Sequence, residues 1–155
     1  MRRLLDGPLS EYSMRITVEI TETVELIAHS PAERHLQRIR EAGFGLAIDD
    51  FGTGFSNLDR LEHLHPALVK LDRSLVVRAG SGVPNSREFA EAATKIGRAV
   101  GAKVLAEGVE SAAEAEAVIT VGAELLQGFR FARPVPVRDL ATRITDDGQL
   151  IMGSQ

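Results

Sequence analysis

Five short apolar segments, set 21 to 35 residues apart, constrain the fold of this chain more than any other feature. Their Ile, Val and Leu content predicts buried strands at Ile16–Ile20, Leu46–Asp50, Leu68–Asp72, Lys103–Glu107 and Glu124–Gln127. The strand centres, near residues 18, 48, 70, 105 and 126, are separated by 30, 22, 35 and 21 residues. Such gaps suit strand–helix–strand crossovers rather than hairpins. The spacing therefore predicts an α/β fold with about five mainly parallel strands.

Helix signals lie in the gaps between these strands. Two gaps begin with a Ser-x-x-Glu capping box and end in a glycine, at residues 30–43 and 111–122. An apolar stripe predicts a third helix over Asn85–Val100, and a shorter helical turn is expected after Ser56. Residues 79–84 form the most loop-like interior segment. These helices are the expected crossover elements.

Composition excludes several classes of function. The 155 residues are 44% hydrophobic, which is enough to bury a core, and the net charge of −4 argues against a nucleic-acid polymer as partner. The absence of cysteine excludes disulfides, thiolate zinc sites and a cysteine nucleophile. No apolar run approaches the ~20 residues of a membrane span, so we expect no membrane span and a cytoplasmic location. A complete (β/α)8 barrel takes roughly 200 residues or more, so this chain is too short for one.

Nearly every apolar segment ends in a charged or amide side chain. These side chains are Glu19 with Glu22, Asp49 with Asp50, Lys70 with Asp72, Glu107 with Glu110, and Gln127. Parallel strands would bring them to one rim, where ligands of α/β folds collect. Crowded carboxylates repel unless cations neutralise them, and oxygen ligands suit Mg²⁺, Mn²⁺ or Ca²⁺. Two adjacent aspartates can bridge two ions, and a lysine can orient a water or steady a phosphate.

Each strand-end signal also has a structural explanation when it is taken alone. Glu19 can be a solvated or helix-capping carboxylate, and Lys70 can pair with its near neighbour Asp72. The agreement of five strand ends favours the functional interpretation over these alternatives.

Two further motifs favour structural interpretations. The Gly52-Thr53-Gly54 segment resembles part of a dinucleotide fingerprint, but Asn57 stands where its third glycine is expected, so a mobile loop is favoured. His63 and His65 alternate like zinc ligands, but Pro66 follows and no partner cluster is near in sequence. Exposed loop histidines are the better interpretation.

Several motifs, in order and at characteristic spacing, resemble the EAL domain family. They are Val18-Glu19-Ile20-Thr21-Glu22, Asp49-Asp50-Phe51-Gly52-Thr53-Gly54-Phe55-Ser56, Lys70-Leu71-Asp72, Ala106-Glu107-Gly108-Val109-Glu110, and Gln127-Gly128-Phe129 with Pro134. The resemblance implies hydrolysis of cyclic di-GMP to pGpG with Mg²⁺ or Mn²⁺, on a TIM-like (β/α) barrel. We assign residues 1–14 to an N-terminal lead-in, 15–144 to a partial EAL domain and 145–155 to a C-terminal tail.

The resemblance implies four groups of functional residues. The metal ligands would be Glu19, Asp49 and Asp50. The attacking water would be positioned or activated by Lys70 and Glu107. The nucleotide would be bordered by Gln127 and Pro134. The loop Asp49–Ser56 would be held in shape by Glu22 and Glu110.

The chain also departs from the family pattern. No Glu-Ala-Leu occurs, although in the family this motif supplies a metal ligand, and an early metal-binding Asn has no counterpart. We therefore expect a two-ion site that is incomplete in this chain, and weak catalysis by the chain alone. The alternative is a non-catalytic module that acts through protein–protein contacts or senses cyclic di-GMP without cleaving it.

A partial barrel leads to a prediction about association. Its two unpaired sheet edges and uncovered apolar surface favour a partner, so we expect a homo-oligomer or pairing with a completing protein segment. Sedimentation measures this directly. A strictly monomeric and stable chain would contradict the prediction.

Overall fold

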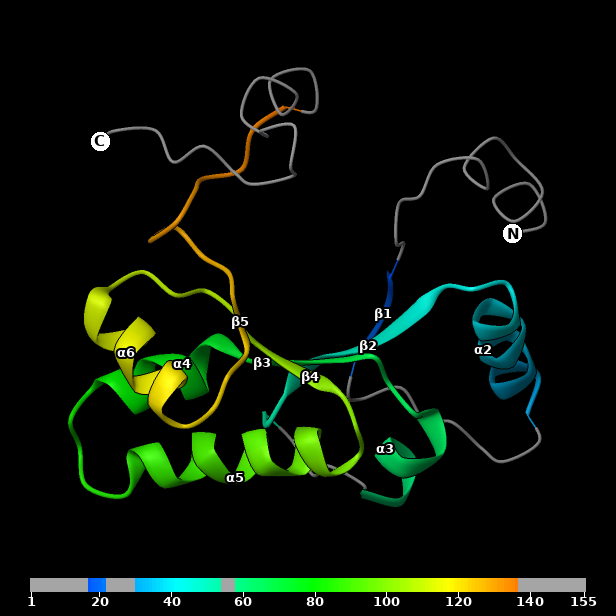
Figure 1. The fold of residues 1–155 in the computed structure, drawn as a ribbon, viewed down its shortest axis with the longest axis horizontal. Helices are drawn as coiled ribbons and strands as arrows, with labels where there is room; N and C mark the ends of the chain where they lie inside the picture. Colours follow the sequence, from blue (N-terminus) through cyan, green and yellow to red (C-terminus); the bar gives the residue numbers. More distant parts are fainter. Residues whose placement is uncertain (1–16, 22–29, 54–57, 137–155) are drawn as a thin grey trace.

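The computed structural model describes residues 17–21, 30–53 and 58–136, which form one sheet and its connecting helices (Figure 1). In chain order the elements are β1 (Thr17–Thr21), α2 (Pro31–Glu41), β2 (Gly45–Phe51), α3 (Leu58–Leu64), β3 (Leu68–Leu71), α4 (Arg73–Gly80), α5 (Ser86–Ala99), β4 (Lys103–Ala106), α6 (Ala112–Thr120) and β5 (Leu125–Leu126). In Figure 1, α5 runs along one side of the sheet, and α4 and α6 lie next to each other at the left of the view. No helix among the described residues is long and apolar enough to cross a membrane.

The sheet has the strand order β1-β2-β3-β4-β5, and every neighbouring pair is parallel. Each connection between neighbouring strands contains at least one described helix. A strand must cross back along the sheet before it can pair in parallel, and the helices provide this return. The prediction of an α/β fold with five parallel strands is confirmed.

The register separates the side chains into two faces. On the helix side, Val69 and Val104 are paired across β3 and β4, are fully buried and belong to the hydrophobic core. Helix α5 packs closely on them, because a Cβ at Gly97 would stand only 3.0 Å from Val104 Cγ2. Successive residues of a strand alternate between faces, so Lys70 lies on the opposite side from Val69.

A β-bulge interrupts the pairing of β2 with β3 at the two adjacent aspartates. Ile48 pairs with Val69 and Phe51 pairs with Leu71, so β2 has one more residue than β3 between these two pairs. Within this bulge, Asp50 has a left-handed φ of 56°. Aspartate tolerates this conformation better than most residues. The extra residue returns Phe51 to the helix side, where it is buried in the core. The bulge therefore allows two consecutive aspartates without exposing Phe51.

The helix boundaries largely follow the capping signals. Ser30 caps α2 with Pro31 as its first residue, and α5 matches the expected range to within one residue at each end. Ser111 and Glu114 form the predicted capping box of α6.

Most strand ends differ from expectation by one residue, and two differences change the elements themselves. Asp72, assigned to the end of a strand, is the N-cap of α4, and its side chain accepts a hydrogen bond from Ser74 N at 2.8 Å. No helix is predicted from the sequence at α4, and the last two residues of α4, Ala79 and Gly80, fall in the segment 79–84 that was expected to be a loop. The last strand is shorter than expected, since β5 contains only Leu125 and Leu126. Ser56 lies outside the described residues.

Neighbouring valines on α4 provide a matched test of this packing. Val76 is fully buried in the core, whereas Val77 is 41% exposed. Val76→Ala should lower the free energy of unfolding by about 2 kcal/mol through lost burial and a residual cavity. Val77→Ala should change it by less than about 0.5 kcal/mol. Chemical denaturation measures both, and equal losses would contradict the assigned orientation of α4.

Candidate functional site

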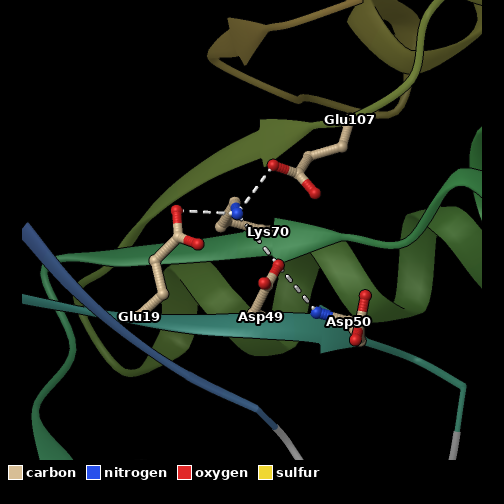
Figure 2. A network of polar contacts seen from close by, with 5 residues as sticks. All are labelled: Glu19, Asp49, Asp50, Lys70 and Glu107. Atoms are coloured by element: carbon tan, nitrogen blue, oxygen red, sulfur yellow. Dashed lines mark hydrogen bonds and ion pairs between the residues drawn. The ribbon is translucent and has the colours of Figure 1, made fainter.

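The described site centres on the buried ammonium of Lys70, whose side chain is 7% exposed. Its Nζ lies 2.8 Å from Glu19 Oε1, 3.0 Å from Asp49 Oδ1 and 2.8 Å from Glu107 Oε1. Figure 2 shows these carboxylates approaching the nitrogen from different directions. We call these four residues the Lys70 cluster. In this cluster, carboxylates from three separate strands or strand ends contact the same ammonium.

The parallel register explains why residues so distant in sequence meet. Glu19 of β1 is 51 positions from Lys70 of β3, and β2 between them contributes Asp49. Glu107 follows β4 directly, and its backbone N–H donates to Leu71 O at 3.2 Å. All four side chains therefore lie near the carboxyl ends of adjacent strands, as the sequence predicted.

The charges of the Lys70 cluster determine the state of its lysine. Burial alone would lower the pKa of the ammonium, but its hydrogen bonds to the three carboxylates outweigh burial, that to Glu107 most. The pKa of Lys70 is therefore held above its usual value, and the side chain remains a cation at neutral pH. Three carboxylates surround one ammonium, which leaves an excess of two negative charges.

Asp50 lies beside the Lys70 cluster rather than in it. Its backbone N–H donates to Asp49 Oδ1 at 3.1 Å, and its exposed carboxylate is directed away from Lys70 (Figure 2). Thr53 donates to Asp50 O through both its backbone N–H and its hydroxyl. The bulge thus places two adjacent carboxylates at different positions around the rim.

The other predicted site residues lie outside the Lys70 cluster in the part of the chain that the structure describes. Gln127 follows β5 and is exposed, and Pro134 is exposed further along the chain. Glu110 forms an ion pair with Arg73, at 2.8 Å from Nη2 to Oε2. Glu22 lies outside the described residues. Asp72, weighed as a partner of Lys70, caps α4 instead.

Arg73 is a residue near the site that the sequence analysis missed. Its Nη1 donates to the carbonyl of Gly108, the residue after Glu107, while Nη2 contacts Glu110. An arginine directly after the Lys-Leu-Asp motif was the available signal, but nothing in the sequence indicated which loop it would reach.

The donor chemistry of the rim suits a hard divalent cation. Glu19, Asp49 and Asp50 offer only oxygen ligands, and the excess negative charge needs compensation. Among the described residues, no group of three or more His, Cys, Asp or Glu side chains is arranged to hold a metal. Lys70 occupies the point where three of the carboxylates meet. Each carboxylate has two oxygens, so its ion pair with Lys70 does not exhaust its capacity to bind a cation.

A family model for the EAL domain matches residues 3–134. The chain belongs to the EAL domain family. The oxygen sensor protein DosP of Escherichia coli is 38% identical over 128 residues, covering 81% of this chain and 16% of DosP. The cyclic di-GMP phosphodiesterase RocR of Pseudomonas aeruginosa is 38% identical over 121 residues, covering 78% of this chain and 31% of RocR. The chain therefore spans less than a third of either relative.

Solved structures extend this similarity to the fold. Klebsiella pneumoniae BlrP1, in manganese/cy-diGMP and calcium/cy-diGMP complexes, superposes with a TM-score of 0.70 at 33% identity. The match covers 84% of this chain and 34% of BlrP1. The five parallel strands are thus part of the TIM-barrel-like fold of EAL domains, which confirms the predicted fold class.

The capping box of α6 restrains the loop that carries Glu110. Glu114 Oε2 accepts hydrogen bonds from the backbone N–H groups of Glu110, at 2.7 Å, and Ser111, at 3.0 Å. Burial alone would raise the pKa of Glu114, but these two donors outweigh it and lower that pKa below the usual 4.5. The Glu114 carboxylate therefore binds a proton more tightly in the unfolded chain than in the folded chain.

This linkage predicts how stability depends on pH. The ionised Glu114 carboxylate contributes fully to the free energy of unfolding at pH values above its unfolded-state pKa. This contribution is lost as the pH falls through the lower pKa of the folded state. At neutral pH, Glu114→Gln should lower the free energy of unfolding by about 1 kcal/mol, and this difference from wild type should shrink in acid. Denaturant titrations across pH measure it, with exposed Glu116→Gln on the same helix as control. A difference that grows in acid would contradict the assignment.

Proposed function

We propose that this chain contributes the rim of a metal-dependent phosphodiesterase site that hydrolyses cyclic di-GMP to pGpG. The observation that carries the proposal is the contact of Lys70 with three carboxylates from separate strand ends. RocR is a cyclic di-GMP phosphodiesterase and the BlrP1 complexes contain cyclic di-GMP, and both observations support this substrate class. Because the chain spans only part of these relatives, the proposal concerns this rim and the reaction it serves.

The proposed cations are Mg²⁺ or Mn²⁺, held by Glu19, Asp49 and Asp50. A bound divalent ion supplies Lewis-acid polarisation of the phosphate and a water acidified enough to attack at neutral pH. Oxygen-only donors favour these ions over zinc or copper. The manganese complex of BlrP1 supports this choice of metal.

Lys70 and Glu107 are the proposed catalytic residues. The Lys70 ammonium is a fixed positive charge in a buried position, so it can stabilise negative charge that develops on a phosphate oxygen. Glu107 contacts the same ammonium and presents a second oxygen with which it can orient a water or accept its proton. Their mutual contact keeps both groups in a defined position before substrate arrives.

The remaining assignments concern the border of the site. We assign Gln127 and Pro134 to the nucleotide border, since both are exposed beyond β5. We assign Glu22 and Glu110 to support of the loop Asp49–Ser56. We also propose that residues 15–144 form the partial EAL domain and that the protein is cytoplasmic. We further propose that the chain forms a homo-oligomer or pairs with a completing protein segment. The chain has no cysteine and so no disulfide, which is compatible with the reducing cytoplasm.

The reaction can be tested with two lysine variants. We expect Mn²⁺- or Mg²⁺-dependent conversion of cyclic di-GMP to pGpG, followed by chromatography of the nucleotides. Lys70→Met should lower kcat by about a hundredfold or more, because it removes the buried positive charge. Lys95→Met should retain wild-type turnover, since Lys95 is an exposed partner of Glu91 on α5.

Three outcomes decide between the proposals. No pGpG from wild type at high protein concentration with Mn²⁺ would reject catalysis by this chain. Tight nucleotide binding without turnover would support the alternative of a sensing module. Equal turnover by wild type and Lys70→Met would reject the assigned role of Lys70.

A further inference from the structure

Arg73 connects two segments that end at the same rim. It is the first residue of α4, just after β3, and its guanidinium reaches the loop after β4. Nη1 donates to Gly108 O, 35 positions away, and Nη2 lies 2.8 Å from Glu110 Oε2. A guanidinium has donors arranged in a fork, so one side chain serves both acceptors.

The contact with Gly108 involves packing as well as charge. Gly108 has a left-handed φ of 67°, and a Cβ placed on it would lie 3.0 Å from Arg73 Cγ. The aliphatic stem of Arg73 therefore occupies the space beside the glycine backbone. This arrangement restrains the main chain of the loop, whereas a simple surface ion pair restrains only side-chain ends.

The restrained loop carries Glu107. Its backbone N–H donates to Leu71 O at 3.2 Å, and its carboxylate contacts Lys70 at 2.8 Å. The hydrogen bond from Arg73 to Gly108 O is a third link between the end of β3 and the loop after β4, and it lies one residue beyond the two links of Glu107. On the other side, Val109 N donates to the carbonyl of Gln127 at 3.0 Å.

The energetics of the Arg73–Glu110 pair favour a positional role over a stabilising one. Both side chains are nearly half exposed, and exposed ion pairs contribute little to folding. Removing the guanidinium should therefore loosen the Glu107–Glu110 segment without unfolding the chain.

We propose that Arg73 is a positioning residue that holds residues 107–110 against the end of β3, so that the Glu107 carboxylate stays on the Lys70 ammonium. Arg73 acts through Glu107 and does not touch the reacting atoms. The catalytic consequence rests on the proposed phosphodiesterase function, whereas the restraint on the loop does not.

Two arginines on α4 allow a matched kinetic experiment on the full chain. Arg73→Met should lower kcat about tenfold and leave KM within about twofold, because Glu107 is misplaced while nucleotide binding is retained. Arg73→Lys should recover only part of this loss, since one ammonium cannot span both acceptors. Arg78→Met is the control, because Arg78 lies on the same helix as Arg73 but stacks on Phe89 of α5, with its Cζ 4.7 Å from the ring centroid. Unchanged kcat in Arg73→Met, or a loss confined to KM, would overturn the proposal.

Amide hydrogen exchange tests the restraint without any activity. Exchange at the Glu107 and Val109 amides should accelerate about tenfold in Arg73→Met, as expected for losing a charged hydrogen bond nearby. Exchange at Ala67, whose N–H donates to Leu46 O at 2.8 Å, should match wild type, and Arg78→Met should alter none of the three. Wild-type exchange at Glu107 and Val109 in Arg73→Met would overturn the proposal. If Arg73→Met accelerates exchange while the wild-type chain shows no turnover, the restraint on the loop is supported and catalysis by this chain is rejected.

Discussion

The contact between the Lys70 ammonium and three carboxylates is the interaction on which the described rim depends. Without a cation at this point, Glu19, Asp49 and Glu107 would repel one another at the ends of adjacent strands. The ammonium offsets part of that repulsion, and the carboxylates in turn keep it charged despite its burial. The remaining excess of negative charge is the physical reason to expect divalent ions at the same rim.

The fold provides the geometry that this interaction needs. Parallel pairing aligns the carboxyl ends of β1 to β4, and the alternation of side chains places Lys70 opposite the helix-packed core. The bulge at Asp50 adds a second carboxylate without moving Phe51 out of the core. Membership of the EAL domain family connects this arrangement to relatives named for cyclic di-GMP hydrolysis.

The sequence allowed the strands and much of the site to be predicted for one physical reason. The carboxyl ends of parallel strands lie at one edge of a sheet, so the strand assignments predicted that Glu19, Asp49, Lys70 and Glu107 would be neighbours there. The register then decides which of these side chains share a face. The left-handed Asp50 did not follow, because a bulge depends on how two strands pair. Arg73 also escaped prediction, because a long side chain can reach any of several neighbouring loops.

The titration of the lysine ammonium groups in the metal-free protein tests the central claim most directly. The chain contains only three lysines, Lys70, Lys95 and Lys103, so their nitrogen resonances can be followed individually by NMR as pH rises. If three carboxylates hold the Lys70 ammonium, the pKa of Lys70 will lie above 10.5, the usual value for a lysine side chain. A Lys70 pKa below that usual value would show that burial dominates and would contradict the account.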